Sequence, residues 1–366
     1  MSMPRSSPSQ LPAVAVTLGL VLLLCLPARA FAVNVTGLYQ ARVQVPDQSS
    51  QAREDALGTA LGRVLTRLSG SSAQGLSATV SNIDAYVQQY QYETDSSGQL
   101  ELVADFSPPA VKRLLRNNGQ LVWGDERPAT LVWLAVQDNG QRRIVSRSSQ
   151  GSFVQALRKQ AHRQGLPMAL PLMDQQDHQS VAFADIWGGF FGQVMQASKR
   201  YHANAVLIGR LSHASSGWRG RWTLIQGGNR DSWQTDGADA AANLKSATDR
   251  LAELYINRYA SRGQNGGQTA AMTVSGVQGL DGYARVLNYL RGLSAVSGVT
   301  VLGVQGDRLL LSLALTSGAN HLQQIIGLGR TLQQAQPPGN GTTWSGTAGS
   351  GQSGPQLYYR FAGKAS

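Results

Sequence analysis

The stretch TLVWLAV, from Thr130 to Val136, is a nearly continuous apolar run near the middle of the chain. Such a run is typical of a β-strand that is buried on both faces, as the central strands of parallel or mixed sheets are. Further strands are predicted at 205–211 and 218–225. Apolar residues at helical spacing predict helices at 152–164 and 244–255 and one long amphipathic helix at 186–198. This alternation predicts an α/β layer with a mixed sheet, which we assign to a central module, residues 126–260.

An N-terminal module, residues 31–125, is predicted from similar patterns. Apolar residues alternate from Tyr39 to Val45, which indicates a strand, and the helix that follows is expected to start near Ser49 and to end at Gly70. A short helical piece at 83–90, a strand at 100–106 and a helix that starts at Pro108 complete the module. We therefore expect two consecutive small α/β modules with mixed sheets.

The segment from Ser261 to Gln268 is rich in Gly, Asn and Gln and is predicted to be a linker, 261–268. It leads to a C-terminal module, residues 269–366, with the expected order strand, helix, strand, strand, helix, strand. This βαββαβ order predicts a ferredoxin-like, α+β arrangement. The Gly-, Ser- and Thr-rich segment 337–355 is expected to be a disordered loop between the last helix and the last strand.

Residues 1–30 have the layout of a cleavable secretory signal peptide. Arg5 supplies a small positive region, an apolar run of 14 residues extends from Ala13 to Leu26, and Ala28-Arg29-Ala30 forms a small-residue cleavage site. Cleavage after Ala32 is the alternative. Because a bilayer-spanning helix needs roughly 20 apolar residues, we expect export with no integral membrane segment left after cleavage.

The mature chain is basic and has no cysteine. Cys25, the only cysteine, lies in the leader, so neither a disulfide nor a thiolate site is expected after cleavage. Loss of Arg5 and Arg29 lowers the formal net charge from +11 to +9. A positive field favours anionic partners, and outside the cytoplasm these are peptidoglycan, lipopolysaccharide, anionic lipid or an acidic protein surface rather than nucleic acid. The other interpretation, which we favour, is that the charge serves solubility alone.

No catalytic, cofactor-binding or metal residue can be named from motifs. The mature sequence has no G-x-S-x-G elbow and no H-E-x-x-H pair, and its histidines are scattered. Gly349 to Gly354 matches G-x-G-x-x-G, but it lies in a low-complexity segment rather than between a strand and a helix, as a dinucleotide site requires. His178 follows Asp174 and Asp177 and could touch a metal, although a solvated polar loop is the commoner meaning of such a run.

The segment Trp218-Arg219-Gly220-Arg221-Trp222 is the candidate binding surface. On a strand, Trp218 and Trp222 share one face, and Arg219 and Arg221 share the other. In a functional interpretation, the tryptophans stack on sugars and the arginines hold phosphate or carboxylate groups. In a structural interpretation, which we favour, the tryptophans lie in the core and the arginines in water.

The sequence VQVPDQS at 43–49, followed by Arg53 and by RLSG at 67–70, resembles the opening of an uncharacterised family of gammaproteobacterial envelope proteins, a domain of unknown function. The resemblance extends through the first two modules, to about Tyr259. It implies a Gram-negative periplasmic setting and supplies no activity, cofactor or catalytic residue.

Together these patterns favour a non-enzymatic periplasmic protein that acts as an adaptor or assembly component of the cell envelope, with a protein partner. A glycan- or anionic-lipid-binding module is the alternative, supported by the net charge and the Trp/Arg strand. An envelope hydrolase is the second alternative. The sequence offers no convergent titratable residues to support it.

Overall fold

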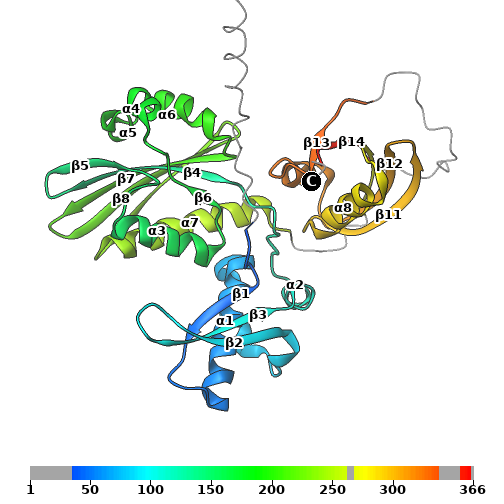
Figure 1. Cartoon of the computed structure of the whole chain (residues 1–366), viewed down its shortest axis with the longest axis horizontal. Coiled ribbons are helices and arrows are strands. Elements are labelled where there is room, and N and C mark those ends of the chain that lie inside the picture. Colours follow the sequence, from blue (N-terminus) through cyan, green and yellow to red (C-terminus); the bar gives the residue numbers. More distant parts are fainter. Residues whose placement is uncertain (1–34, 262–267, 338–354, 364–366) are drawn as a thin grey trace, which may run out of the picture.

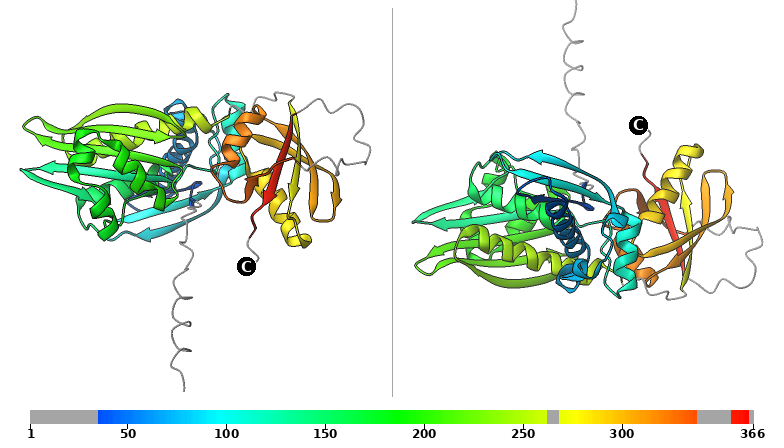
Figure 2. Two further views of the ribbon diagram at one scale, coloured as in Figure 1. Left: turned by 90° about the horizontal axis from the view of Figure 1, so that it is seen from above. Right: turned by 90° about the horizontal axis from the view of Figure 1, so that it is seen from below.

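The computed structural model describes residues 35–261, 268–337 and 355–363 and has a mixed α/β fold (Figure 1). The predicted signal peptide 1–30 lies outside the described residues. Of the predicted linker only Ser261 and Gln268 are described, and of the predicted loop 337–355 only its first and last residues are. Figure 2 shows the central and C-terminal modules at opposite ends of the longest axis.

The N-terminal module packs one long helix on an antiparallel sheet. Its strands are β1 (Gln40–Gln44), β2 (Val87–Thr94) and β3 (Leu100–Phe106), in the order β1-β3-β2. Both pairings are antiparallel, so the mixed sheet expected for this module was wrong. The helical piece expected at 83–90 was also wrong, since only Asp84–Tyr86 forms a 3-10 turn before β2 starts. Pairing with β3 outweighs the local helical pattern there.

Local signals set the ends of helix α1 (Ser50–Ser69). The Ser49 side chain accepts a hydrogen bond from the Ala52 amide at the N-terminus. Gly70, at φ 79°, ends the helix and returns its N–H to the Thr66 carbonyl. The helix covers the sheet with a buried apolar stripe that includes Leu57, Leu61, Val64, Leu65 and Leu68. Helix α2 (Pro108–Asn117) follows β3, with proline in its first turn.

The central module contains the mixed sheet that the sequence predicts. Its strand order is β5-β4-β7-β8-β9, with the short β6 paired to β4. β4 is parallel to β6 and β7, and the other pairs are antiparallel. The strands are β4 (Thr130–Asp138), β5 (Gln141–Val145), β6 (Met168–Ala169), β7 (Ala205–Ala214), β8 (Gly217–Gln226) and β9 (Asn229–Gly237).

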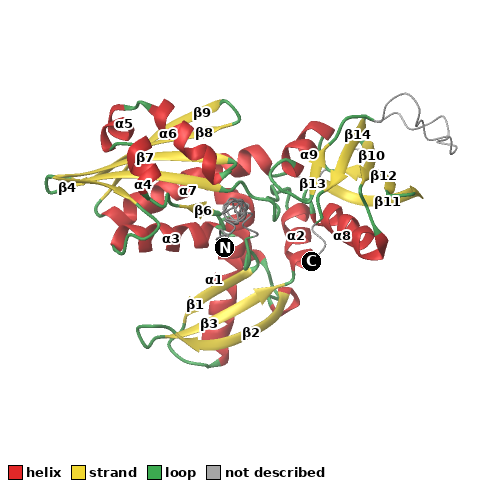
Figure 3. Ribbon diagram, turned by 45° about the horizontal axis from the view of Figure 1, so that its top comes forward, coloured by secondary structure: helices red, strands yellow, loops and turns green. Residues whose placement is uncertain are grey.

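Helices cover both faces of this sheet, which is why β4 is buried from Thr130 to Val136 and apolar from Leu131 to Val136 (Figure 3). One face bears α3 (Ser152–Gln164) and α7 (Ala240–Tyr259), and the other bears α4 (Gln175–Ser180), α5 (Phe183–Gly188) and α6 (Phe191–Ser198). Val132, Leu134 and Val136 belong to the core on the α3/α7 side. Leu131, Trp133 and Ala135 belong to the core on the α5/α6 side.

The single amphipathic helix expected at 186–198 was wrong. The chain breaks it into α5 and α6 at Gly189, which adopts φ 83°. A side chain is strained at such an angle, so the glycine permits the turn. The break leaves the Phe190 side chain 68% exposed between two helices whose other aromatic residues pack inward.

The C-terminal module has the sheet order β11-β12-β10-β14-β13. Its elements are β10 (Thr269–Ser275), α8 (Gly279–Gly292), β11 (Val296–Gln305), β12 (Arg308–Leu315), α9 (Ala319–Ile326), β13 (Leu332–Gln334) and β14 (Gln356–Phe361). The ferredoxin-like arrangement is not confirmed, because β14 runs parallel to β10. The additional strand β13 forms the edge and pairs antiparallel with β14, so the last strand enters the sheet in the opposite direction.

A shared apolar core connects the central and C-terminal modules, and hydrogen bonds of Ser261, the residue that follows the central module, reach both Val122 and Ser294. Ser261 forms a β-bridge with Val122 and donates its hydroxyl to the Ser294 carbonyl at 3.0 Å. The Thr316 hydroxyl donates to the same carbonyl at 2.9 Å. Buried residues of both modules, from β4 and α7 to β10 and α8, form one continuous apolar cluster. Ser261, predicted as the start of the linker, is therefore part of the joint.

Glu126 lies at this joint and is expected to make stability depend on pH. Its carboxylate and the Tyr289 hydroxyl both border Gly329, each 2.9 Å from where a Cβ on that glycine would lie. Burial, and then the charge of Asp125, raise the pKa of Glu126 from its ordinary 4.5 to about 7. The folded state therefore favours the neutral acid, and its contribution to stability is full below pH 4.5 and is lost as the pH rises to about 7.

We expect Glu126→Gln to remove this pH dependence. Relative to the parent, the variant should gain about 1–2 kcal/mol in the free energy of unfolding between pH 4.5 and 8, roughly half of the full linkage value because the carboxyl is partly exposed. Urea unfolding across that pH range measures the difference. Asp281→Asn, on the exposed side of α8, is the control. Its free energy of unfolding should depend on pH as that of the parent does. Parallel pH profiles for the parent and Glu126→Gln would contradict the expectation.

Candidate functional site

The structure separates the two tryptophans of β8 from its two arginines. Trp222 is 1% exposed on the α3/α7 side, where its Nε1 donates to the Thr235 hydroxyl at 2.8 Å. Trp218, half-buried on the same side, stacks on His213 with ring centroids 4.8 Å apart. Arg219 and Arg221 are exposed on the opposite face of the strand. The four residues therefore do not form one binding platform.

Arg219 and Arg221 instead join arginines from neighbouring strands. Arg221 lies opposite Arg210 of β7, and Arg230 of β9 pairs with Ile225, which faces the same side as Arg221. Arg142 of β5 shares this face because its partner Gln137 points the same way as Ala135, the partner of Arg210. We call this surface the arginine face; it consists of Arg142, Arg210, Arg219, Arg221 and Arg230.

Contacts with α5 and α6 fix the inner part of the arginine face. The Arg210 guanidinium donates to the Trp187 carbonyl at 2.9 Å, and the Arg230 guanidinium lies 4.8 Å from the centre of the Phe191 ring. Burial, followed by the charges of Arg221 and Arg230, lowers the pKa of Arg210. Arg221 and Arg230 therefore both act on Arg210 as like charges.

Acidic residues balance only part of this charge. Arg219 forms an ion pair with Asp236, with Nε and Oδ1 3.3 Å apart. Across the described residues, no ion pair joins Arg210, Arg221 or Arg230 to a carboxylate. The exposed Phe190 lies in the chain between Trp187 and Phe191, the residues that contact Arg210 and Arg230. The surface thus carries arginines that no described carboxylate neutralises, and the exposed Phe190 belongs to the chain segment that contacts two of them.

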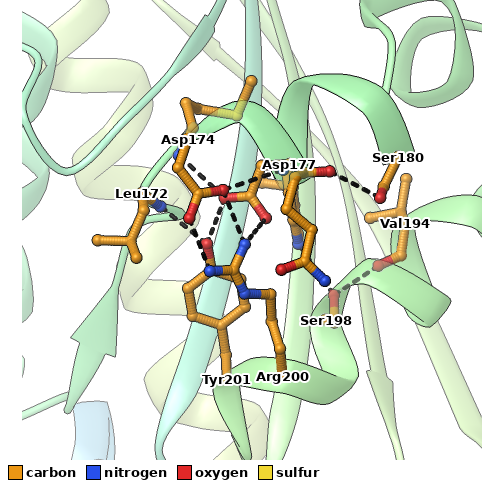
Figure 4. Close-up of polar contacts among 11 residues, drawn as sticks. Leu172, Asp174, Asp177, Ser180, Val194, Ser198, Arg200 and Tyr201 are labelled. Carbon is orange, nitrogen blue, oxygen red and sulfur yellow. Dashed lines mark hydrogen bonds and ion pairs between the residues drawn. The ribbon is translucent and has the colours of Figure 1, made fainter. Parts of the chain in front are cut away.

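A second polar cluster surrounds the buried Asp177 of α4 (Figure 4). Its carboxylate accepts hydrogen bonds from the Met173 amide at 2.9 Å, from Arg200 Nη1 at 3.1 Å and from the Tyr201 hydroxyl. Asp174 caps α4 and binds both terminal nitrogens of Arg200, at 2.8 and 2.7 Å. Hydrogen bonding from Arg200 holds the pKa of Asp174 well below its ordinary value.

This cluster holds a loop in place rather than presenting open reactive groups. The Tyr201 hydroxyl accepts from the Leu172 amide at 2.9 Å while it donates to Asp177, and Met173 between them adopts φ 52°. His178, the one residue for which the sequence allowed a metal role, is exposed on α4. Within the described ranges, His, Asp and Glu side chains form no group of three that could hold a metal ion.

A comparison with protein-family models gives a match in the N-terminal module. Residues 32–124 match a domain of unknown function, DUF8605. This DUF8605 region covers the helix α1 and the antiparallel sheet beneath it, and it agrees with the resemblance to an uncharacterised domain at 43–70. The match ends before the central module, so it does not extend to Tyr259. No curated protein and no solved structure matches the chain.

In the parts of the chain that the structure describes, no helix is both long enough and apolar enough to cross a membrane.

Proposed function

We propose that this protein is a non-enzymatic adaptor or assembly component of the Gram-negative cell envelope, exported to the periplasm. The leader-like sequence of residues 1–30 supports export, and the resemblance at 43–70 supports the envelope setting. The partner is an envelope protein that presents an acidic surface. The arginine face of the central module is where it docks.

The uncompensated charge of the arginine face is the observation that carries this proposal. Like charges directly opposite one another on neighbouring strands, as Arg210 and Arg221 are, destabilise a sheet. A carboxylate-rich partner would relieve this repulsion and accept hydrogen bonds from the planar guanidinium groups. Such charges at the rim of an interface mainly increase the rate of association and its dependence on salt.

A glycan- or anionic-lipid-binding role is the second candidate, and the exposed Phe190 favours it. An exposed aromatic ring can stack on a sugar or enter the headgroup region of a membrane, while the arginine face holds phosphate. Phosphate-bearing lipopolysaccharide and vesicles with anionic lipid are therefore the probes that separate the two candidates.

We expect the double variant Arg221→Gln/Arg230→Gln to bind its envelope partner about tenfold more weakly, which corresponds to ~0.7 kcal/mol for each arginine. The measurement is recovery of the partner from envelope extracts by the mature protein, repeated from low to high salt. Loss should be largest at low salt, since salt screens exposed charges. Retention on lipopolysaccharide or anionic vesicles, with no protein partner recovered, would favour the second candidate.

Arg250→Gln is the matched control, because Arg250 is exposed on α7, on the other side of the sheet, and pairs with Glu253. It removes one positive charge without touching the arginine face. If Arg250→Gln weakens binding as much per charge as the double variant does, net charge alone explains binding, and the proposed docking face is wrong.

A further inference from the structure

A cavity of about 520 Å³ opens beside α3, away from the arginine face. One face of α3 forms a wall through Leu157 and Ala161, with Arg158 and His162 next to them. The segment from Leu166 to Leu170, which includes β6, forms the opposite side, and Leu131 at the start of β4 lies in the wall. A cavity of this size falls in the range of small-ligand sites.

The lining of this cavity is apolar inside and cationic at its mouth. Leu157, Ala161, Leu166 and Leu170 are buried side chains of the lining. Arg147 and Arg158, which are exposed, lie at the edge, where Arg158 donates to the Arg147 carbonyl at 3.1 Å. The described residues that line it include no aspartate or glutamate. The charge of the mouth is therefore positive.

The imidazole of His162, which also lines the cavity, does not add to this charge at neutral pH. Burial, and then the positive charges of Arg67 and Arg42, lower the pKa of its imidazole. An anion at the mouth would meet the two arginines and a neutral histidine that can donate one N–H.

The Asp177 cluster keeps one wall of the mouth in place. Leu172 and Tyr201 both line the cavity, and the Tyr201 hydroxyl connects the Leu172 amide to the buried Asp177. Leu172 is 42% exposed although its amide is held by the Tyr201 hydroxyl. A ligand that enters would cover this side chain, so burying it favours binding.

We propose that this cavity binds a single long acyl chain that ends in a carboxylate or a phosphate. The chain lies among Leu157, Ala161 and Leu170, and the anionic head lies at Arg147 and Arg158. Charge complementarity at the mouth selects the anionic head, and the apolar interior selects the chain. The inference goes beyond the proposed docking role and uses none of the residues of the arginine face.

The test uses the mature protein, residues 31–366, after removal of bound lipid. The probes are palmitate, palmitoyl lysophosphatidylglycerol and, as heads without chains, acetate and inorganic phosphate; calorimetric titration measures binding. The proposal is supported if palmitate or the lysophospholipid binds at micromolar concentration while acetate and phosphate do not bind at the same concentrations. Of palmitate and the lysophospholipid, the one that binds more tightly identifies the preferred head group. Absence of binding by both chains overturns it.

Variants locate the site. Arg158→Gln should weaken binding about tenfold at low salt, whereas Lys159→Gln, the neighbouring exposed cation on α3 that does not line the cavity, should leave it unchanged. Ala161→Phe fills the interior and should abolish binding. Because Ala161→Phe can also disturb folding, its melting temperature is measured first. If it unfolds, the comparison of Arg158→Gln with Lys159→Gln decides alone. Equal weakening by Arg158→Gln and Lys159→Gln overturns the proposed site.

Discussion

Trp222→Ala should lower the free energy of unfolding by about 3–5 kcal/mol, the cost of truncating a large buried aromatic side chain. Trp222 is 1% exposed and belongs to the core between the sheet and α7. Its Nε1 donates to the Thr235 hydroxyl, which in turn donates to the Asn243 side chain of α7 at 2.7 Å. The truncation would thus leave a cavity and remove one hydrogen bond of a buried network.

The backbone around Trp222 is shaped to its ring, which makes collapse into the cavity difficult. A Cβ on Gly209, the cross-strand partner of Trp222, would lie 2.3 Å from the ring. Glycine therefore provides the space that the indole occupies, and no side chain there can move in to fill the cavity.

Urea unfolding of Trp222→Ala beside Arg221→Gln measures the contrast between the two faces of one strand. Arg221 is exposed on the arginine face, so its variant should remain within about 0.5 kcal/mol of the parent. A Trp222→Ala protein of unchanged stability would contradict the structural role of the ring and would favour tryptophan as a ligand contact.

Sequence patterns located the elements that have strong local signals. The run at 130–136 identified a strand buried on both faces, and Ser49 and Gly70 marked the two ends of α1. The strand expected at 100–106 is β3 with the same bounds. These features depend on residues a few positions apart, which the sequence displays directly.

Elements without such signals were missed. β9 (Asn229–Gly237) is an edge strand with a polar sequence, NRDSWQTDG, so nothing alternates clearly enough to indicate a strand. β13 has three residues, too few for any pattern. The direction of β14 follows from β13 and from pairing with β10, a partner more than eighty residues earlier in the chain.

The arginine face could be predicted from the sequence only in part, because only neighbours along one strand are visible there. Strand alternation placed Arg219 and Arg221 together and away from the tryptophans. Their association with Arg210 and Arg230 depends on the register of three strands, and the support of Tyr201 by Asp177 depends on two helices and a loop. Neither can be read from spacing along the chain.

A second joint, between the DUF8605 region and the central module, contains two buried arginines. None of the hydrogen bonds between these arginines and the described residues goes to a carboxylate. Arg67 donates to the carbonyls of Gly37, Leu38, Gln40 and Arg163 at 2.8–2.9 Å. Arg127 donates to the carbonyls of Gly124, Gln164, Gly165 and Arg67 at 2.9–3.2 Å. Backbone carbonyls from the ends of α1 and α3 are thereby satisfied by side chains from elsewhere.

Arg127→Ala should destabilise the protein by about 3 kcal/mol. Arg127 is 4% exposed, and its guanidinium also lies 3.8 Å from the centre of the Trp123 ring. The substitution leaves buried carbonyl groups unpaired, and each one that water cannot reach costs about 1–3 kcal/mol. The protein also no longer has to desolvate the cation, but this gain is smaller than the loss. Arg127→Lys should recover less than half, since one ammonium group cannot reach carbonyls on both sides of the joint.

Hydrogen exchange shows whether the loss lies at the joint. In Arg127→Ala, amide exchange should accelerate first in the last turns of α1 and α3, whose carbonyls Arg127 binds, while the sheet of the C-terminal module keeps its protection. Arg113→Ala, on the exposed side of α2, is the matched control and should cost less than about 0.5 kcal/mol. If Arg127→Ala costs no more than the control, the buried guanidinium does not hold the two modules together, and the apolar contacts around α1 must do so alone.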